Sequence, residues 1–183
     1  FETCSAVVTV VDLTPPELTC VADRNVECLA VWDFDAPTAV DACGTNTITV
    51  VGTVTNAACG NTFAATRTWR ATDAFGNFSE CSQTITVVDT EAPAVTLAPG
   101  ADATIECPAL PVFSAPEFAD ACQGAVTVSE ATVTNAVGCT NLITRTWTAE
   151  DGCGNSTNRS QTIAVVDLTP PGLSCVGDKT VDC

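Results

Sequence analysis

The residues of this sequence whose types could support chemistry are its cysteines and its aspartates. Twelve cysteines recur along 183 residues that include no histidine. The sequence therefore offers no histidine base, and its cysteines recur at positions typical of structural bonds. The acidic pair Asp33 and Asp35 lies among residues typical of an exposed loop, which argues against glycoside hydrolysis. We therefore expect that the chain is not an enzyme.

The aspartates suit calcium, because Ca²⁺ accepts six to eight hard oxygen ligands. We expect the Asp that ends the last strand of one repeat to lie against loop acids of the next, where a bound ion would stiffen the junction. The alternative is that these acids only end strands and start turns, since no DxDxD loop is present. No other cofactor is indicated. The predicted ligands are Asp12, Glu17, Asp41 and Asp73 at one junction and Asp89, Glu91, Asp120 and Asp151 at the next.

The cysteines predict disulfide bonds and therefore an oxidising compartment, extracellular or at the cell surface. Structural zinc is the competing explanation, but zinc sites use CxxC pairs or histidine, and the sequence contains neither. Cys20 and Cys81 form the first predicted pair. The matching positions of the second repeat hold Leu97 and Arg159, so both partners are replaced together.

The other predicted pairs assume that loops meet at the two ends of a sandwich fold. Phe75 stands where the partner of Cys43 would be, so Cys43 is predicted to be a free thiol, either buried and inert or linked to another chain. A pairing of neighbouring loops, Cys43 with Cys59 and Cys122 with Cys139, stays open. The predicted pairs are Cys28–Cys59, Cys107–Cys139 and Cys122–Cys153.

These residues belong to an internal repeat, which the strings VTVVDLTPP, TITVVDTEAP and TIAVVDLTPP mark. Asp12 and Asp89 are 77 residues apart, and Asp89 and Asp167 are 78 apart. Such a period is typical of a tandem array. We predict the last strand of a preceding repeat over 1–12, complete repeats over 13–89 and 90–167, and the start of a following repeat over 168–183. The sequence is therefore expected to be a window from a longer array.

Alternating apolar residues predict short strands separated by turn residues, with little helix. We interpret the chain as all-β, made of tandem immunoglobulin-like antiparallel β-sandwich repeats. Trp69 and Trp147 occupy matching positions and are predicted core residues. Trp32 has no counterpart in the second repeat and could contact a glycan or a neighbour. The main predicted strands are 47–55, 63–72 and 81–88 in the first repeat and 126–134, 143–149 and 161–166 in the second.

The charge of the chain excludes several partners. A net charge of −16 with only six basic residues would repel nucleic acid and anionic lipid surfaces. No apolar run approaches the ~20 residues that a membrane-spanning helix requires. We therefore expect no nucleic-acid partner and no membrane span in this part of the protein.

The strings VVDLTPP, PTAVDACG, RTWRATDAFGN and CSQTITVVD resemble the hyalin-repeat (HYR)-like and related immunoglobulin-like repeats of long bacterial cell-surface adhesins. They are most similar to repeats exported by the type IX route in gliding and predatory Bacteroidota, and the resemblance covers the whole chain. It implies a stalk that holds an adhesive tip away from the cell. Phe75, Leu97 and Arg159 depart from the family pattern, which usually has cysteine at these positions.

Two hypotheses for function follow. The first is a structural stalk segment of a secreted, disulfide-stabilised filamentous adhesin or extracellular fibre, used for attachment, gliding or prey capture. Its partners would be neighbouring repeats of the same chain, with a homo-oligomeric bundle or filament as a further option. The second is a carbohydrate- or receptor-binding immunoglobulin-like module that uses Trp32 and the acidic loops.

Overall fold

The computed structural model describes residues 3–122, 126–174, 177 and 180. The described residues form two compact units: unit 1 comprises those in 1–94, 119–127 and 150–156, and unit 2 comprises those in 95–118, 128–149 and 157–183. Within these residues the secondary structure is strand without helix. No described helix is therefore long and apolar enough to cross a membrane.

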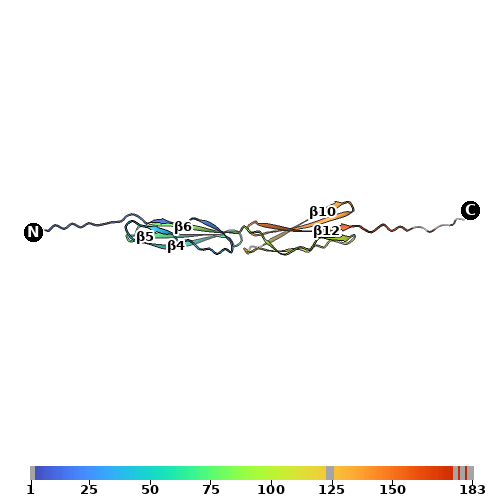
Figure 1. The fold of residues 1–183 in the computed structure, drawn as a ribbon, viewed down its shortest axis with the longest axis horizontal. Helices are drawn as coiled ribbons and strands as arrows, with labels where there is room; N and C mark the ends of the chain where they lie inside the picture. The colour runs from blue at the N-terminus through green and yellow to red at the C-terminus, as the bar shows by residue number, and fades with distance from the viewer. Residues whose placement is uncertain (1–2, 123–125, 175–176, 178–179, 181–183) are drawn as a thin grey trace. The chain divides into compact units, whose positions relative to one another are not determined.

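Unit 1 contains a four-stranded sheet in the order β2-β6-β5-β4 and a two-stranded sheet of β1 and β3 (Figure 1). β5 pairs antiparallel with both β4 and β6, whereas β2 runs parallel to β6 with Glu27 opposite Val88. The result is the predicted sandwich. The strands are β1 (Glu17–Thr19), β2 (Arg24–Glu27), β3 (Thr38–Val40), β4 (Asn46–Ala57), β5 (Phe63–Asp73) and β6 (Phe78–Val88).

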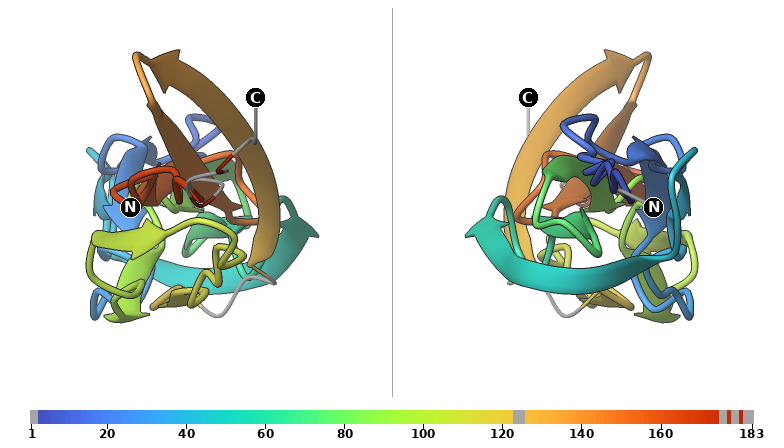
Figure 2. Two further views of the ribbon diagram at one scale, coloured as in Figure 1. Left: turned by 90° about the vertical axis from the view of Figure 1, so that its right-hand side faces the viewer. Right: turned by 90° about the vertical axis from the view of Figure 1, so that its left-hand side faces the viewer.

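The core of unit 1 lies on the central hairpin of β5 and β6. Trp69 and Ala71 on β5 and Ile85 and Val87 on β6 are all buried, because alternate residues of a strand face the same side. β4 pairs with this hairpin but buries little. Its register shifts at Val50/Gly52, and most of its residues are exposed. Figure 2 shows β4 (teal) as a long, strongly curved strand.

The second set of strands repeats this arrangement. Its larger sheet has the order β10-β11-β12-β8, with β12 and β8 parallel, and its smaller sheet pairs β7 with β9. Trp147, Ala149 and Ile163 are buried on β11 and β12. The strands are β7 (Ala94–Leu97), β8 (Ala103–Glu106), β9 (Glu117–Ala119), β10 (Thr127–Val137), β11 (Thr140–Glu150) and β12 (Ser156–Val166).

Trp32 packs in an aromatic cluster and is half-buried. Its ring lies 5.7 Å from that of Phe34 and 5.8 Å from that of Phe63, and Phe34 in turn contacts Trp69. The guanidinium of Arg67 lies 4.2 Å above the ring of Phe34. Trp32 therefore extends the aromatic core of unit 1 through Phe34, which contacts Trp69.

Two buried glutamines tie the loops to the central hairpin of each repeat. Gln83 is 0 % exposed; its Oε1 accepts from the backbone N–H of Asp35, and its Nε2 donates to the carbonyl of Ala22 and to Asp35. Gln161 makes the equivalent bonds to Ser114 and to the carbonyl of Ala101. Neither glutamine was predicted from the sequence to have this role.

The last strand of a preceding repeat over 1–12 stays a prediction. Residues 3–16 carry no strand in the described chain. At the other end, the described part of 168–183 also contains no strand, and the remaining residues of that predicted repeat lie outside the described residues.

Candidate metal clusters and disulfide cross-links

Cys20 and Cys81 form a disulfide, as the paired replacement of their counterparts predicts. Their Cα atoms lie 5.9 Å apart, within the ordinary disulfide range. Cys20 directly follows β1, and Cys81 lies on β6 opposite Trp69. The bond therefore fastens the edge of the small sheet to the central hairpin.

Two further disulfides each join a cysteine of residues 13–89 to a cysteine of residues 90–167. Cys28 pairs with Cys122 and Cys59 pairs with Cys153, with Cα separations of 5.8 and 5.0 Å. Each bond spans 94 residues of sequence. All four cysteines belong to unit 1, because the segments 119–127 and 150–156 are part of that unit.

The predictions that each repeat closes its own disulfides are wrong. Cys28–Cys59 and Cys122–Cys153 do not form, because all four residues are used in the two bonds above. Cys107 and Cys139, which were also expected to pair, are both exposed and unpaired among the described residues. The alternative of neighbouring loops, Cys43 with Cys59 and Cys122 with Cys139, fails for the same reasons.

Local geometry explains the observed pairing. The N–H of Cys28 donates to the carbonyl of Val88, which places the end of β2 beside the residues that follow β6. The side chain of Asn61 donates to the carbonyl of Cys122, and Gly152 lies against the backbone of Gly60. The loops that carry Cys122 and Cys153 therefore meet the loops of Cys28 and Cys59, and not each other.

Cys43 is unpaired and exposed among the described residues, so the prediction of a free thiol holds and the prediction of burial does not. The presence of Phe75, however, does not explain why Cys43 is unpaired. Phe75 matches Cys153, whose partner is Cys59, so Phe75 does not replace a partner of Cys43. The negative charge of Asp12, with smaller contributions from burial and from Asp41, raises the pKa of the Cys43 thiol.

Three of the predicted calcium ligands meet at one end of unit 1. Asp12, Asp41 and Asp73 each place one carboxylate oxygen within 4.8 Å of the others, and we call this group the first cluster. Asp12 accepts a hydrogen bond from the N–H of Thr14, and Asp41 accepts one from the N–H of Cys43. These local bonds involve only Oδ1 of Asp12 and of Asp41.

Asp89, Asp120 and Asp151 form a second cluster with the same spacing limit of 4.8 Å. Asp89 accepts from the N–H of Glu91 and Asp120 from the N–H of Cys122, as in the first cluster. Burial, followed by the charges of Asp120, Asp151 and Glu27, raises the pKa of Asp89 above its ordinary value, although the bond from Glu91 opposes this. The carboxylates of this cluster therefore repel one another.

Asp73 and Asp151 are held by an asparagine of the following turn. The side chain of Asn77 donates to Asp73 and to the carbonyl of Asp12, and Asn155 does the same for Asp151 and Asp89. Burial alone would raise the pKa of Asp73 and Asp151. The hydrogen bonds that they accept from the asparagine and from the turn backbone outweigh burial, so both pKa values lie below the ordinary value.

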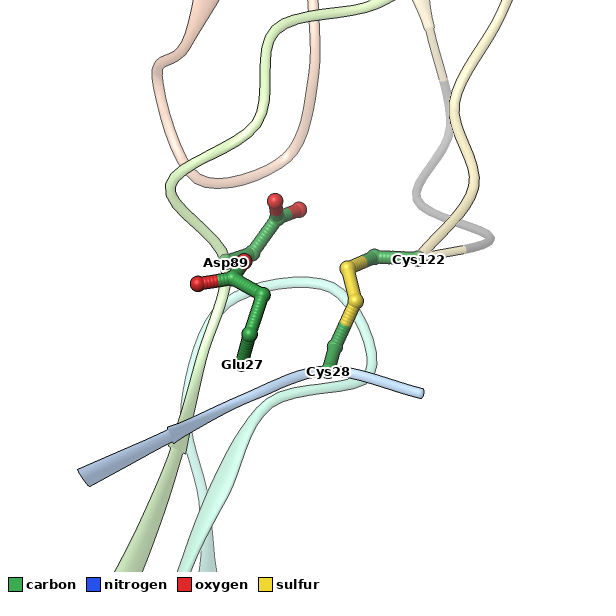
Figure 3. A group of neighbouring side chains, drawn as sticks. All are labelled: Glu27, Cys28, Asp89 and Cys122. Atoms are coloured by element: carbon green, nitrogen blue, oxygen red, sulfur yellow. A yellow bond between two sulfur atoms is a disulfide. The ribbon is translucent and has the colours of Figure 1, made fainter. Parts of the chain in front are cut away.

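A third group of possible ligands surrounds the Cys28–Cys122 disulfide (Figure 3). It contains Glu27 and Asp89 with the two sulfur atoms. The sulfurs are already bonded to each other and cannot act as thiolate ligands. Glu27 also accepts hydrogen bonds from the N–H and hydroxyl of Thr90. This group is therefore a cross-link beside two carboxylates and not a further metal centre.

Glu17 and Glu91 lie outside both clusters, and their role as ligands stays a prediction. Glu17 is exposed on β1 and lines a pocket of about 240 Å³ together with Asp41, but its carboxylate does not join the first cluster. Glu91 is exposed and contributes its backbone N–H to Asp89. Glu17 and Glu91 follow Asp12 and Asp89 along the chain, but this proximity does not bring their side chains into the clusters.

The chain combines tandem β-sandwich repeats with disulfide cross-links, which are typical of extracellular and cell-surface proteins. The chain belongs to the family of HYR-like domains with 4 cysteines, whose family model matches residues 5–87 and 95–165. The second matched segment contains four cysteines, and the first contains five.

Several solved structures are similar to the chain at low identity. Human mucin-like protocadherin EC1-2 is 9% identical, with 83% of this chain and 98% of that chain covered and a TM-score of 0.34. Drosophila N-cadherin EC1-3 is 13% identical, with coverages of 85% and 68% and a TM-score of 0.32. Mouse cadherin-23 EC22-24 is 12% identical, with coverages of 84% and 67% and a TM-score of 0.35. No curated protein matches the sequence significantly.

Proposed function

We propose that this chain is a load-bearing stalk segment of a secreted surface adhesin or extracellular fibre. The observation that carries the proposal is the pair of disulfides Cys28–Cys122 and Cys59–Cys153, which connect one sequence repeat to the next. Disulfides within one repeat would be enough to stabilise the fold of that repeat. Disulfides to the following repeat also resist extension of the chain under tension.

The cross-links provide a covalent route that is shorter than the backbone. Tension applied to the ends of the chain passes through the sulfur bonds, and the 94 residues that each bond spans are protected from full extension. The acidic surface, with a net charge of −16, keeps such a polymer soluble. Attachment, gliding or prey capture would each put tension on such a stalk, and the adhesive tip would lie elsewhere in the protein.

Pulling single molecules by their two ends tests the proposal. In a variant with Cys28→Ser and Cys59→Ser, Cys20–Cys81 is the one disulfide of the described residues that still restrains the unfolded chain. Reduction of that variant should release a step of roughly 200 Å, because the bond spans 61 residues at about 3.3–3.6 Å each. Reduction of the unaltered chain should release a clearly larger step, since both repeat-to-repeat bonds also open.

Equal steps in the two proteins would show that the repeat-to-repeat bonds carry no load, and the proposal would be abandoned. The matched control is the variant with Cys20→Ser and Cys81→Ser, which keeps both repeat-to-repeat bonds. The length that this variant releases on reduction should come from those two bonds alone.

A further inference from the structure

We propose that unit 1 binds one Ca²⁺ ion through the first cluster, Asp12, Asp41 and Asp73. One carboxylate oxygen of each residue lies within 4.8 Å of the other two. Two oxygens that coordinate one Ca²⁺ at about 2.4 Å lie no more than about 4.8 Å apart, so the spacing of these three oxygens meets a requirement for binding a single ion. The residues come from separate segments: the stretch before β1, the loop after β3 and the end of β5. Water and backbone carbonyls would complete the coordination.

An orphaned oxygen shows where a cation is needed. Asp12 is only 7% exposed, and its Oδ2 is buried without any hydrogen-bond partner. Among the side chains that the structure describes, it is the one buried nitrogen or oxygen left without a partner. A buried, unpartnered carboxylate oxygen is costly, because it has lost water and gained nothing in exchange. A metal ion in the first cluster would supply the missing partner.

No cationic side chain of the described residues serves this purpose. The ion pairs that form are Arg24–Asp35, Arg70–Glu80 and Arg145–Glu130, and none involves the first cluster. Arg67 bonds to Thr53, and Arg159 bonds to a neighbouring carbonyl. The three negative charges of the cluster therefore face one another without compensation, which favours a divalent ion.

The donor set selects calcium among common divalent ions. All three donors are carboxylates carried by loops and strand ends, which suit the flexible, oxygen-rich coordination of Ca²⁺. Mg²⁺ is smaller and demands near-octahedral geometry. Zn²⁺ prefers nitrogen and sulfur, whereas the three donors of the first cluster are all carboxylate oxygens.

Thermal unfolding with and without Ca²⁺ tests this site, which does not depend on the stalk function. Every protein compared carries Asp120→Asn, so that the first cluster is the intact one. After treatment with a chelator, Ca²⁺ at ten times its Kd should raise Tm by on the order of 5 °C. We expect a Kd on the order of 10⁻⁴–10⁻³ M, as in other extracellular modules.

Three single substitutions distinguish binding at the first cluster from a nonspecific effect of Ca²⁺. Adding Asp12→Asn or Asp41→Asn should abolish the response to Ca²⁺, and Asp41→Asn covers the case in which the buried Asp12 variant does not fold. Glu17→Gln removes the same charge close by but outside the cluster, and should keep the full response. An unchanged Tm in Ca²⁺, an equal rise in Mg²⁺ or in NaCl of matched ionic strength, or a full response in Asp41→Asn would overturn the proposal.

Discussion

Neutral amide side chains organise the loops of each repeat. Asn77 and Asn155 bridge a turn aspartate and a distant carbonyl, and Gln83 and Gln161 bridge the central hairpin to preceding loops. An amide can donate and accept at once, whereas a carboxylate only accepts. In a chain with six basic residues, the amides satisfy buried backbone groups that charged side chains cannot.

Replacement of Gln83 tests this role. Gln83→Leu keeps the size of the buried side chain but leaves the N–H of Asp35 and the carbonyl of Ala22 without their partners. We expect the free energy of unfolding to fall by about 2–4 kcal/mol, since each unsatisfied buried group costs about 1–3 kcal/mol. Urea unfolding measures the change. Thr84→Val, on the same strand but half-buried, is the control, and a comparable loss there would contradict the explanation.

Among the elements, the hairpin of β5 and β6 supports the rest of the first repeat. It carries the buried residues Trp69 and Ile85, pairs with β2 and β4, and holds the small sheet through Cys20–Cys81. The small sheet has strands of three residues, which offer few backbone hydrogen bonds of their own. The disulfide therefore supplies much of the attachment of β1.

Removal of this disulfide should destabilise unit 1 strongly. For Cys20→Ser with Cys81→Ser we expect a loss of about 4 kcal/mol, because the bond closes a loop of 61 residues in the unfolded chain. Calorimetry of the oxidised proteins measures it. The second repeat carries Leu97 and Arg159 at these positions and serves as an internal reference whose transition should not move. A loss of stability confined to the unfolding transition of the second repeat would contradict this prediction.

At the scale of the whole molecule, the disulfides follow a rule that links each sequence repeat to the next. The N–H of Cys107 donates to the carbonyl of Val166 at 2.9 Å, as that of Cys28 does to Val88 at 2.8 Å. Cys107 and Cys139 thus occupy the places of Cys28 and Cys59, and both are unpaired and exposed in the described chain. We predict that, in a chain with a further repeat, their partners by this rule would be the counterparts of Cys122 and Cys153 in that repeat.

A longer chain tests the rule. If residues 90–167 are duplicated after residue 167, we predict that Cys107 bonds to the duplicated copy of Cys122 and Cys139 to the duplicated copy of Cys153. Peptide mapping without reduction identifies the pairs. A bond between Cys107 and Cys139 in that chain would contradict the rule, and the persistence of Cys28–Cys122 serves as the control for correct folding.

The strands could be predicted because their signal is local. Alternation of apolar residues in 63–72 and 81–88 depends only on the period of a strand, and β5 and β6 extend over these residues. The burial of β4 could not be predicted in the same way. Val50 and Val54 alternate as in a half-buried strand but are 55% and 63% exposed, because no layer of the described unit covers that part of the sheet.

The sequence by itself determined the repeat, the all-β fold, the Cys20–Cys81 pair and the six aspartates that form the two clusters, because each of these is visible as a period or as a paired replacement. The tertiary structure alone decided the partners of Cys28, Cys59, Cys122 and Cys153, and it alone separated the clustered aspartates from Glu17 and Glu91. A disulfide needs Cα atoms within a few ångströms and an ion needs converging oxygens. Such distances depend on how loops far apart in the chain are brought together, which the order of residues does not specify locally.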